Sequence, residues 1–302
     1  MADNFRGIFA IAQTPFDALG NLSFDDLERE CDWIVRAGAH GLVWPVMASE
    51  FTVISYPERV KGMQLVVQAV AGRIPVVIGV ADTSKAGAAS LAEEAAKAGA
   101  EAIIAMPPWA TKLEGRDPVE DYYRALAKAA AIPIIVQNCG PPLGSSLPGP
   151  FVVQLCREIP LVQYLKEEKP PQGHSVSEVI ALGGQDVKGV FSGSSARWLM
   201  TEYKRGVCGN MPAAVLPDVD AQIWDLLEIG REEEARKIHD AKTLFENALA
   251  SMPYRRARKE ILVRRGVISN PYGRNLGDQD LDAVDLAELE HALHLIEPYF
   301  RV

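Results

Sequence analysis

Short apolar runs recur along the first two thirds of the chain, and longer stretches of mixed polarity separate them. Seven clear runs and one weaker run occupy residues 7–13, 41–46, 74–80, 101–107, 132–138, 161–166, 187–193 and 206–211. Most of them lack an alternation of apolar and polar positions, so both faces of each predicted strand are expected to be buried. This pattern is typical of a parallel sheet that is covered by helices.

The intervening stretches have the spacing of amphipathic helices, which we expect at 24–37, 57–71, 84–98, 118–131, 148–158, 174–183 and 194–205. Their first residues favour helix initiation. Ser23 and Ser84 can accept a hydrogen bond from the first turn, and Pro57 suits the first helical position. Several helices end at a glycine, which suits the left-handed residue after a helix. These glycines are Gly38, Gly72, Gly99 and Gly183.

The repeat of one strand and one helix sets the fold class. Each repeat spans about 20 to 35 residues, which is the length of one βαβ unit. Eight such units predict a closed (β/α)8 TIM barrel, because no glycine-rich nucleotide-binding loop follows the first strand to favour an open sheet. From residue 217 onward the β runs cease, and helical periods appear at 219–230, 232–250, 254–265 and 283–298. We therefore expect residues 1–216 to form the barrel core and residues 217–302 to add the last barrel helix and a C-terminal helical extension, within one structural unit.

Composition narrows the class of protein further. A chain of 302 residues with 48% hydrophobic residues can hold its core without a metal or a disulfide. Its net charge of −9 argues against binding to nucleic acid, because phosphates demand a basic face. The cysteines and histidines show no spacing of metal ligands or of a disulfide framework. Since no targeting signal or membrane-spanning run is evident, we expect a cytoplasmic protein with neither a membrane nor a metal partner.

Polar residues stand where the predicted strands end, and the active site of a barrel gathers at those ends. Lys166 ends an apolar strand and shares one face with Glu168 if the chain stays extended. A lysine surrounded by apolar strands can be desolvated until its free amine attacks a ketone. A carboxylate beside it could then transfer a proton. From spacing alone, a pair of solvated loop charges explains these residues equally well.

The other strand ends are less specific when each is taken alone. Ser49-Glu50 fits a helix-capping pair, and Gln137-Asn138 fits side chains that satisfy loop backbone. The run Ser192-Gly193-Ser194-Ser195 fits either an anion-binding nest or the N-cap of the helix expected at 194–205. A basic run from Arg255 to Arg265 is interpreted as a partly solvated helix or a subunit contact.

Taken together, the strand ends resemble the dihydrodipicolinate synthase / N-acetylneuraminate lyase superfamily. The resemblance covers about residues 6–300 and rests on Thr14-Pro15-Phe16, Ser49-Glu50, Met106-Pro107-Pro108, Gln137-Asn138, Lys166-Glu167 and Phe191-Ser192-Gly193. It implies a (β/α)8 barrel with C-terminal helices, a small-molecule 2-oxo acid substrate and a Schiff-base lysine, for which Lys166 takes the place. It also implies a homo-oligomer, usually a tetramer, and no metal or organic cofactor.

Several positions depart from the synthase pattern. The family's Gly-Thr-Thr-Gly-Glu strand end reads Val46-Met47-Ala48-Ser49-Glu50, so both threonines are missing. Gln137 stands where the family has its catalytic tyrosine, and Pro142 stands where synthases grip the carboxylate of aspartate semialdehyde with an arginine. A side chain without a hydroxyl or a positive charge cannot perform those tasks. Dihydrodipicolinate synthase activity is therefore not expected.

One branch of the superfamily shares these departures. Val136-Gln137-Asn138 and Lys166-Glu167-Glu168 are similar to the 2-keto-3-deoxyarabonate dehydratases. On this resemblance Lys166 condenses with the C2 ketone, Glu168 removes a C3 proton, and the C4 hydroxyl leaves as water. Ser49, Gln137 or Asn138 would assist departure of the hydroxyl, while backbone N–H groups around Ala48 and Ser49 would hold the carboxylate. Ser192, Gly193 and Asn210 complete the predicted substrate-binding residues.

Two alternatives remain open. A retro-aldolase would use the same imine to release pyruvate from a 4-hydroxy-2-oxo acid, and an inactive barrel would only bind a 2-oxo acid. The sequence does not specify the sugar acid. Trp109 and Ala110 replace residues of the usual subunit contact, so either a dimer or a tetramer fits the pattern.

Overall fold

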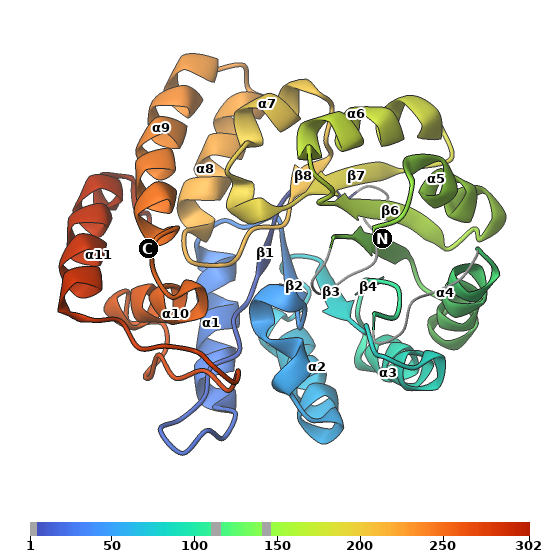
Figure 1. Cartoon of the computed structure of the whole chain (residues 1–302), viewed down its shortest axis with the longest axis horizontal. Helices are drawn as coiled ribbons and strands as arrows, with labels where there is room; N and C mark the ends of the chain where they lie inside the picture. The colour runs from blue at the N-terminus through green and yellow to red at the C-terminus, as the bar shows by residue number, and fades with distance from the viewer. Residues whose placement is uncertain (1–4, 110–115, 141–145) are drawn as a thin grey trace.

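The computed structural model describes residues 5–109, 116–140 and 146–302, and its strands close into a parallel barrel (Figure 1). The strands are β1 Gly7–Ile11, β2 Gly41–Trp44, β3 Val76–Gly79, β4 Ala102–Ala105, β5 Ile134–Asn138, β6 Val162–Glu167, β7 Gly189–Ser192 and β8 Gly209–Asn210. They pair in sequence order, and β8 pairs with β1 to close the circle. The predicted (β/α)8 barrel is confirmed, with strands somewhat shorter than the apolar runs.

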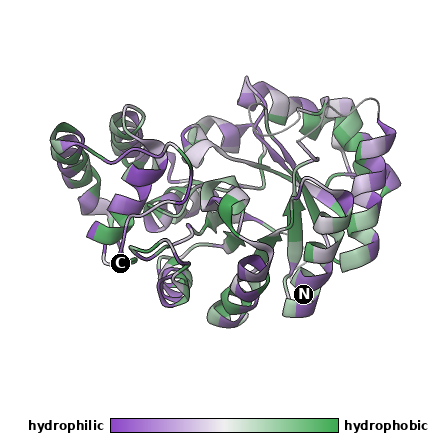
Figure 2. Cartoon of the chain, turned by 60° about the horizontal axis from the view of Figure 1, so that its bottom comes forward, coloured by the Kyte–Doolittle hydropathy of each residue, from purple (hydrophilic) through white to green (hydrophobic). Residues whose placement is uncertain are grey.

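Helices alternate with the strands and cover the outside of the barrel. The barrel helices are α1 Phe24–Arg36, α2 Tyr56–Val70, α3 Lys85–Ala98, α4 Asp117–Ala130, α5 Gly149–Glu158, α6 Gln172–Gly183, α7 Leu199–Lys204 and α8 Pro217–Glu228. Figure 2 shows that the helices carry both hydrophilic and hydrophobic residues, as expected of helices that pack one side against a sheet and expose the other. In the part of the chain that the structure describes, no helix has the length and hydropathy needed to cross a membrane.

Local chemistry at the helix ends follows the sequence closely. The Ser23 hydroxyl accepts a hydrogen bond from the backbone of α1, and the Ser84 hydroxyl accepts one from the backbone of α3 at 3.0 Å. Gly38, Gly72 and Gly99 are left-handed, as expected. The expectation for Gly183 is wrong, because this residue still belongs to α6 and the left-handed residue is Gly184.

The single helix expected at 194–205 is also wrong. Ser194, Ser195 and Ala196 form a left-handed turn with φ values of 55°, 55° and 54°, and α7 begins only at Leu199. A non-glycine residue in this region costs about 1–3 kcal/mol and persists only where surrounding structure holds it. Contacts made by distant C-terminal residues hold this turn, so a helical pattern in the local sequence could not reveal it.

Aromatic and aliphatic side chains fill the inside of the barrel. The interior cluster includes Phe5, Phe9, Val43, Val77, Ile104, Ile135, Tyr164 and Phe191. The rings of Phe9 and Phe191 meet edge to face, with centroids 4.9 Å apart. On β6, Lys166 follows Tyr164 by two positions and therefore points to the same side, above this packed layer.

Three further helices follow the barrel: α9 Glu232–Leu249, α10 Tyr254–Arg264 and α11 Ala283–Ile296. Figure 1 shows them gathered at the side of the barrel that α1 and α8 cover. On α10, Arg258 and Lys259 are only 2% and 1% exposed, whereas the side chain of Arg255 is 40% exposed. Our interpretation of the basic run as a partly solvated helix is therefore confirmed, although the burial of these two charges was not expected. Since α8 begins at Pro217, the division at residue 216 falls between two elements, and it stays a prediction.

Candidate active site

A cavity of about 360 Å³ opens at the carboxyl ends of the strands. Lys166, Glu168 and Gln137 contribute to its wall, together with Met47, Ala48 and Cys139. Its outer part is lined by residues that follow β7 and by the first turns of α10. These residues are Ser194, Ser195, Arg197, Trp198, Tyr254 and Arg258. Polar groups from opposite ends of the chain thus share one concave site.

The amine of Lys166 lies beside a carboxylate. Its Nζ is 3.1 Å from Oε2 of Glu168, and the amide nitrogen of Gln137 donates to the same oxygen at 3.0 Å. The side chains of Lys166 and Glu168 are 5% and 17% exposed, which excludes the alternative of solvated loop charges. Because the N–H of Glu168 donates to the carbonyl of Asn138 at 2.9 Å, the chain stays extended beyond β6 and keeps the two side chains on one face.

Gly193 allows the Glu168 side chain to occupy this position. A Cβ atom at Gly193 would lie 2.2 Å from Oε1 and 2.7 Å from Cδ of Glu168, far inside van der Waals contact. Only a residue without a side chain therefore lets β7 approach the carboxylate this closely. The structure gives Gly193 a steric role beside its predicted part in substrate binding.

Asn138 and Glu167 point away from the amine. The Asn138 amide nitrogen donates to Glu167 at 2.7 Å and to the carbonyl of Leu147 at 3.1 Å, while its oxygen accepts the Leu147 N–H at 2.8 Å. Burial raises the pKa of the Glu167 carboxyl, and the hydrogen bond from Asn138 opposes that rise. Asn138 thus fixes the segment that leads into α5, and its predicted contact with the substrate stays a prediction.

The end of β2 is a tight turn in which the N–H, the hydroxyl and the carbonyl of Ser49 all have hydrogen-bond partners within the protein. Its N–H donates to the carbonyl of Val46 at 2.9 Å, and its hydroxyl donates to the carbonyl of Ala12 at 2.6 Å. Thr14 in turn donates its hydroxyl to the carbonyl of Ser49 at 2.5 Å. Of the two residues predicted to bind the substrate carboxylate, Ala48 lines the cavity, and Ser49 supports the turn from behind.

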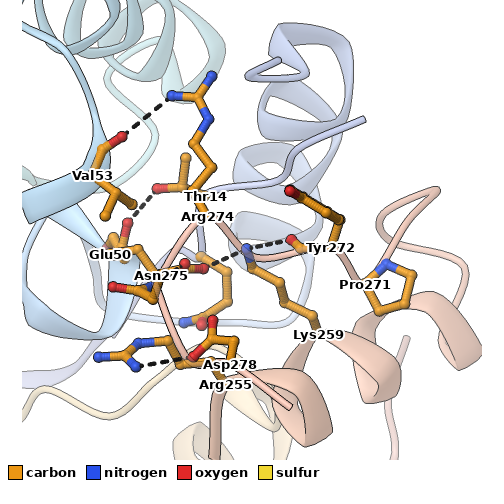
Figure 3. Close-up of polar contacts among 12 residues, drawn as sticks. Thr14, Glu50, Val53, Arg255, Lys259, Pro271, Tyr272, Arg274, Asn275 and Asp278 are labelled. Carbon is orange, nitrogen blue, oxygen red and sulfur yellow. Dashed lines mark hydrogen bonds and ion pairs between the residues drawn. The ribbon is translucent and has the colours of Figure 1, made fainter. Parts of the chain in front are cut away.

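Glu50 continues this turn in the left-handed region and reaches the C-terminal extension (Figure 3). Its carboxylate forms an ion pair with Lys259 of α10 and accepts a hydrogen bond from Asn275. Lys259 also donates to the carbonyl of Tyr272 at 2.8 Å. Glu50 therefore anchors the extension to the β2 end, and the helix-capping interpretation of Ser49-Glu50 is wrong for its carboxylate.

A buried polar cluster joins the ends of β7 and β8. The Ser192 hydroxyl donates to Glu202 at 2.6 Å, and the amide of Asn210 donates to Ser192 at 2.7 Å and to the carbonyl of Gly193 at 3.1 Å. Gln172 donates to the other oxygen of Glu202 at 2.6 Å. Burial raises the pKa of Glu202. This carboxyl was not predicted, and a lone glutamate in α7 offers no sequence signal for its position under β7.

Four side chains of the outer wall were missed by sequence reasoning, which had singled out only Ser194 and Ser195 there. Arg197 and Trp198 follow the left-handed turn, and Tyr254 and Arg258 come from α10. Only the basic run around Arg258 gave a signal, and it did not indicate burial. Two positions that depart from the synthase pattern, Ala110 and Pro142, lie outside the described residues. Within the described ranges, no cluster of three or more His, Cys, Asp or Glu side chains could hold a metal ion.

A model of the dihydrodipicolinate synthetase family matches residues 4–280. The chain belongs to this family. The predicted superfamily is thereby confirmed, and the protein is a lyase of the dihydrodipicolinate synthetase family. The resemblance in the sequence rested on residues at the strand ends, and the structure shows that Gln137 and Lys166 among them line one cavity.

Individual relatives refine this assignment. An L-2-keto-3-deoxyarabonate dehydratase of Azospirillum brasilense is 32% identical over 232 residues, which are 76% of this chain and 75% of that protein. A 4-hydroxy-tetrahydrodipicolinate synthase of Rhizobium meliloti (strain 1021) is 27% identical over 301 residues, 95% of this chain and 98% of that protein. The predicted likeness to the 2-keto-3-deoxyarabonate dehydratases is confirmed.

The fold is shared with solved structures. YagE, a prophage protein from E. coli K12 that was solved in complex with pyruvate, superposes with a TM-score of 0.90. The two proteins are 21% identical, and the match covers 97% of this chain and 99% of YagE. At this level of identity the comparison establishes the common barrel with its C-terminal helices.

Proposed function

We propose that the protein is a Schiff-base lyase that dehydrates a 2-keto-3-deoxy sugar acid such as 2-keto-3-deoxyarabonate. The observation that carries this proposal is the contact of Lys166, Glu168 and Gln137 in the wall of one cavity. The similarity to the dehydratase of Azospirillum brasilense supports the choice of reaction. The complex of YagE with pyruvate supports a 2-oxo acid as the ligand class.

In the first step the neutral amine of Lys166 attacks the C2 carbonyl carbon. The carbonyl oxygen takes up two protons and leaves as water, which gives a protonated imine between Nζ and C2. Glu168 accompanies this change, because its Oε2 lies 3.1 Å from Nζ and can pass a proton to the departing oxygen. The positive imine then makes the protons on C3 acidic, because it can accept the electrons of a C3–H bond.

In the second step the Glu168 carboxylate removes a proton from C3. The electrons of the C–H bond form the C2=C3 bond of an enamine, and the imine nitrogen is neutralised. The enamine nitrogen then re-forms the imine as the C2=C3 electrons move to a C3=C4 bond, and the C4 hydroxyl takes up the proton held by Glu168 and leaves as water. Gln137 holds Oε2 of Glu168 through its amide N–H and so orients the base without competing for the proton. The C3=C4 bond and the C5 hydroxyl of 2-keto-3-deoxyarabonate then isomerise to the C5 aldehyde, because C5 and its hydroxyl each lose a proton while C3 and C4 each gain one. Hydrolysis of the imine releases the 2-oxo semialdehyde and frees the amine of Lys166.

The residues behind the wall give the site rigidity in this scheme. Asn138, Ser49, Ser192 and Asn210 are each bonded to neighbouring groups of the strand ends. Ala48 lines the cavity beside Met47 in the β2 turn, and we assign the substrate carboxylate to the backbone of Ala48. The family likeness also leads us to propose a homo-oligomer, either a dimer or a tetramer.

The test is borohydride reduction in the presence of pyruvate and, separately, of 2-keto-3-deoxyarabonate, followed by peptide mass spectrometry. We expect an adduct on Lys166, no adduct in Lys166→Ala, and an unaltered adduct in Lys188→Ala. Lys188 is a suitable control, because it is exposed and precedes β7 at the opposite end of the barrel.

The products separate the alternatives. Release of a 2-oxo semialdehyde from the sugar acid, without pyruvate, agrees with the dehydratase. Pyruvate in the products would replace the dehydratase with the retro-aldolase. Absence of any adduct in the wild-type protein would leave an inactive barrel that binds a 2-oxo acid.

A further inference from the structure

A buried arginine of the C-terminal extension forms part of the catalytic cavity. Arg258 of α10 is 2% exposed and lines the same cavity as Lys166. Its Nη2 donates to the hydroxyl of Ser195 at 3.0 Å and lies 3.2 Å from a carboxylate oxygen of Glu246. Its guanidinium carbon lies 3.8 Å from the centroid of the Tyr254 ring. The side chain is therefore fixed on one edge by polar contacts and on one face by an aromatic ring.

Of the three guanidinium nitrogens, only Nη2 has a hydrogen-bond partner among the residues that the structure describes. The Nε of Arg258 is buried and has no hydrogen-bond partner among the residues that the structure describes. A buried N–H without an acceptor is unfavourable, because folding removes its water and supplies nothing in return. The pair with Glu246 explains why a charge is tolerated here, but Oε1 of that carboxylate is also buried without a hydrogen-bond partner among the described residues, so the contact satisfies neither group fully. Arg258 lines the cavity, so an oxygen of a bound ligand would give the guanidinium a further acceptor.

The neighbouring turn holds this arginine in place. Ser195 lies at the centre of the left-handed turn after β7, where its hydroxyl contacts Arg258 and its carbonyl accepts from Lys242 at 2.5 Å. Lys242 is itself paired with the buried Asp220. Two cations from separate helices thus fasten one strained turn, and a donor that is fixed before binding loses little entropy when it captures an oxygen.

The charges of the cavity distinguish its two regions. Lys166 and Glu168 balance each other at the strand ends. In the outer wall Arg258 has Glu246 as its partner, whereas the exposed Arg197 forms no ion pair within the described residues. This part of the cavity is therefore positive and rich in donors, which favours a polar, oxygen-bearing group over an apolar one.

We infer that Arg258 is a specificity-determining residue that binds an oxygen at the far end of the substrate carbon chain. The inference rests on the proposed function, in which Lys166 fixes C2 and leaves the tail to extend toward α10. Either a terminal hydroxyl or a terminal carboxylate supplies the accepting oxygen. The guanidinium fork suits both, and a carboxylate gains more from the positive charge.

The first experiment uses the wild-type protein and two ligands of equal length. Borohydride trapping is titrated with 5-hydroxy-2-oxopentanoate and with 2-oxopentanoate, which differ only in the oxygen at C5. We expect half-maximal trapping at a concentration about tenfold lower for the hydroxylated acid, the effect of one hydrogen bond to a charged donor. Equal concentrations would overturn the inference, because the tail oxygen would then have no partner in the cavity.

The second experiment compares Arg258→Lys with Arg255→Lys. Lysine keeps the positive charge beside Glu246 but lacks the Nε donor, and Arg255 lies on the same helix with its side chain 40% exposed. We expect Arg258→Lys to raise KM for 2-keto-3-deoxyarabonate about tenfold, and more for a 2-keto-3-deoxy sugar acid with a terminal carboxylate. Pyruvate, which has no tail, should be trapped at the wild-type concentration.

The outcomes separate this inference from the proposed function. An unchanged KM in Arg258→Lys, or a parallel rise for pyruvate, contradicts the inference, since the residue would then act only through the shape of the site. If wild-type protein forms no adduct with any 2-oxo acid, the proposed function itself fails. If Arg258→Lys does not fold, the comparison of the two ligands on the wild-type protein still decides the matter.

Discussion

The close approach of Gly193 to Glu168 gives the sharpest test of the catalytic geometry. In Gly193→Ala the new Cβ would lie 2.2 Å from Oε1 of Glu168, so the carboxylate must move. Restoring van der Waals contact requires a shift of roughly 1 Å. A displacement of this size in a reacting group reduces rates about a hundredfold, which corresponds to about 2.7 kcal/mol in the activation barrier. We therefore expect kcat to fall about a hundredfold.

The assay follows formation of the 2-oxo semialdehyde from 2-keto-3-deoxyarabonate, with thermal unfolding measured beside it. Trapping of pyruvate on Lys166 should persist, because Gly193 is not within the same contact distance of the amine. A double-mutant cycle isolates the cause. In a Glu168→Gln background the change of Gly193 to alanine should cost little further activity, since the group that it displaces is already disabled. A kcat in Gly193→Ala close to that of the wild type, in a folded protein, would refute the assignment of Glu168 as the positioned base.

Three further predictions follow from the buried charges. Glu168→Gln should lower kcat about 10²–10⁴-fold while pyruvate is still trapped, at a lower rate, because removal of the C3 proton requires the carboxylate whereas water can also protonate the departing C2 oxygen. Complete loss of trapping would contradict this division of roles. Burial raises the pKa of Glu30 from 4.5 to about 8, so the folded protein holds its proton more tightly than the unfolded chain does. The stability from this group is present below pH 4.5 and lost as the pH rises to about 8. Thermal unfolding should show a steeper fall over this interval for the wild type than for Glu30→Gln, and identical slopes would contradict the reasoning. Lys259→Met should reduce the free energy of unfolding by about 3–5 kcal/mol, because Glu50 is left buried without a cation. In urea denaturation the double variant Lys259→Met/Glu50→Gln should recover most of that loss, and an equally unstable double variant would show that packing dominates.

The strand ends show which features of the site can be predicted from the local sequence. The fully apolar runs and the alternation of β6 were enough to predict the barrel and to place Lys166 and Glu168 on one face. Hydrogen bonding at the ends of β2 and β5 was not predictable in the same way. The N–H of Ser49 donates to Val46 because the turn is held in this shape by hydrogen bonds to Ala12 and Thr14, which lie far away in the sequence.

Charged residues of α10 show the opposite case. The same helix carries half-buried Arg255 and fully buried Arg258 and Lys259, and no local pattern separates them. Their partners are far away in the chain: Arg258 reaches Ser195, and Lys259 reaches Glu50. A charged side chain is buried only where it contacts an opposite charge or a hydrogen-bond acceptor. In α10 these contacts form only when the C-terminal extension packs against the barrel.

The sequence by itself determined the class of this protein, because strand periodicity, helix-end chemistry and the order of strand-end residues are all local properties. These properties predicted the parallel barrel, the C-terminal helices and the lysine at the carboxyl end of β6. Only the tertiary structure decided which polar groups face the cavity and which support it from behind. The left-handed turn at Ser195 and the free donor of Arg258 exist only because Lys242, Glu246 and α10 come together there. Contacts between segments that are distant in the sequence form only when the whole chain folds, and they cannot be predicted from local sequence patterns.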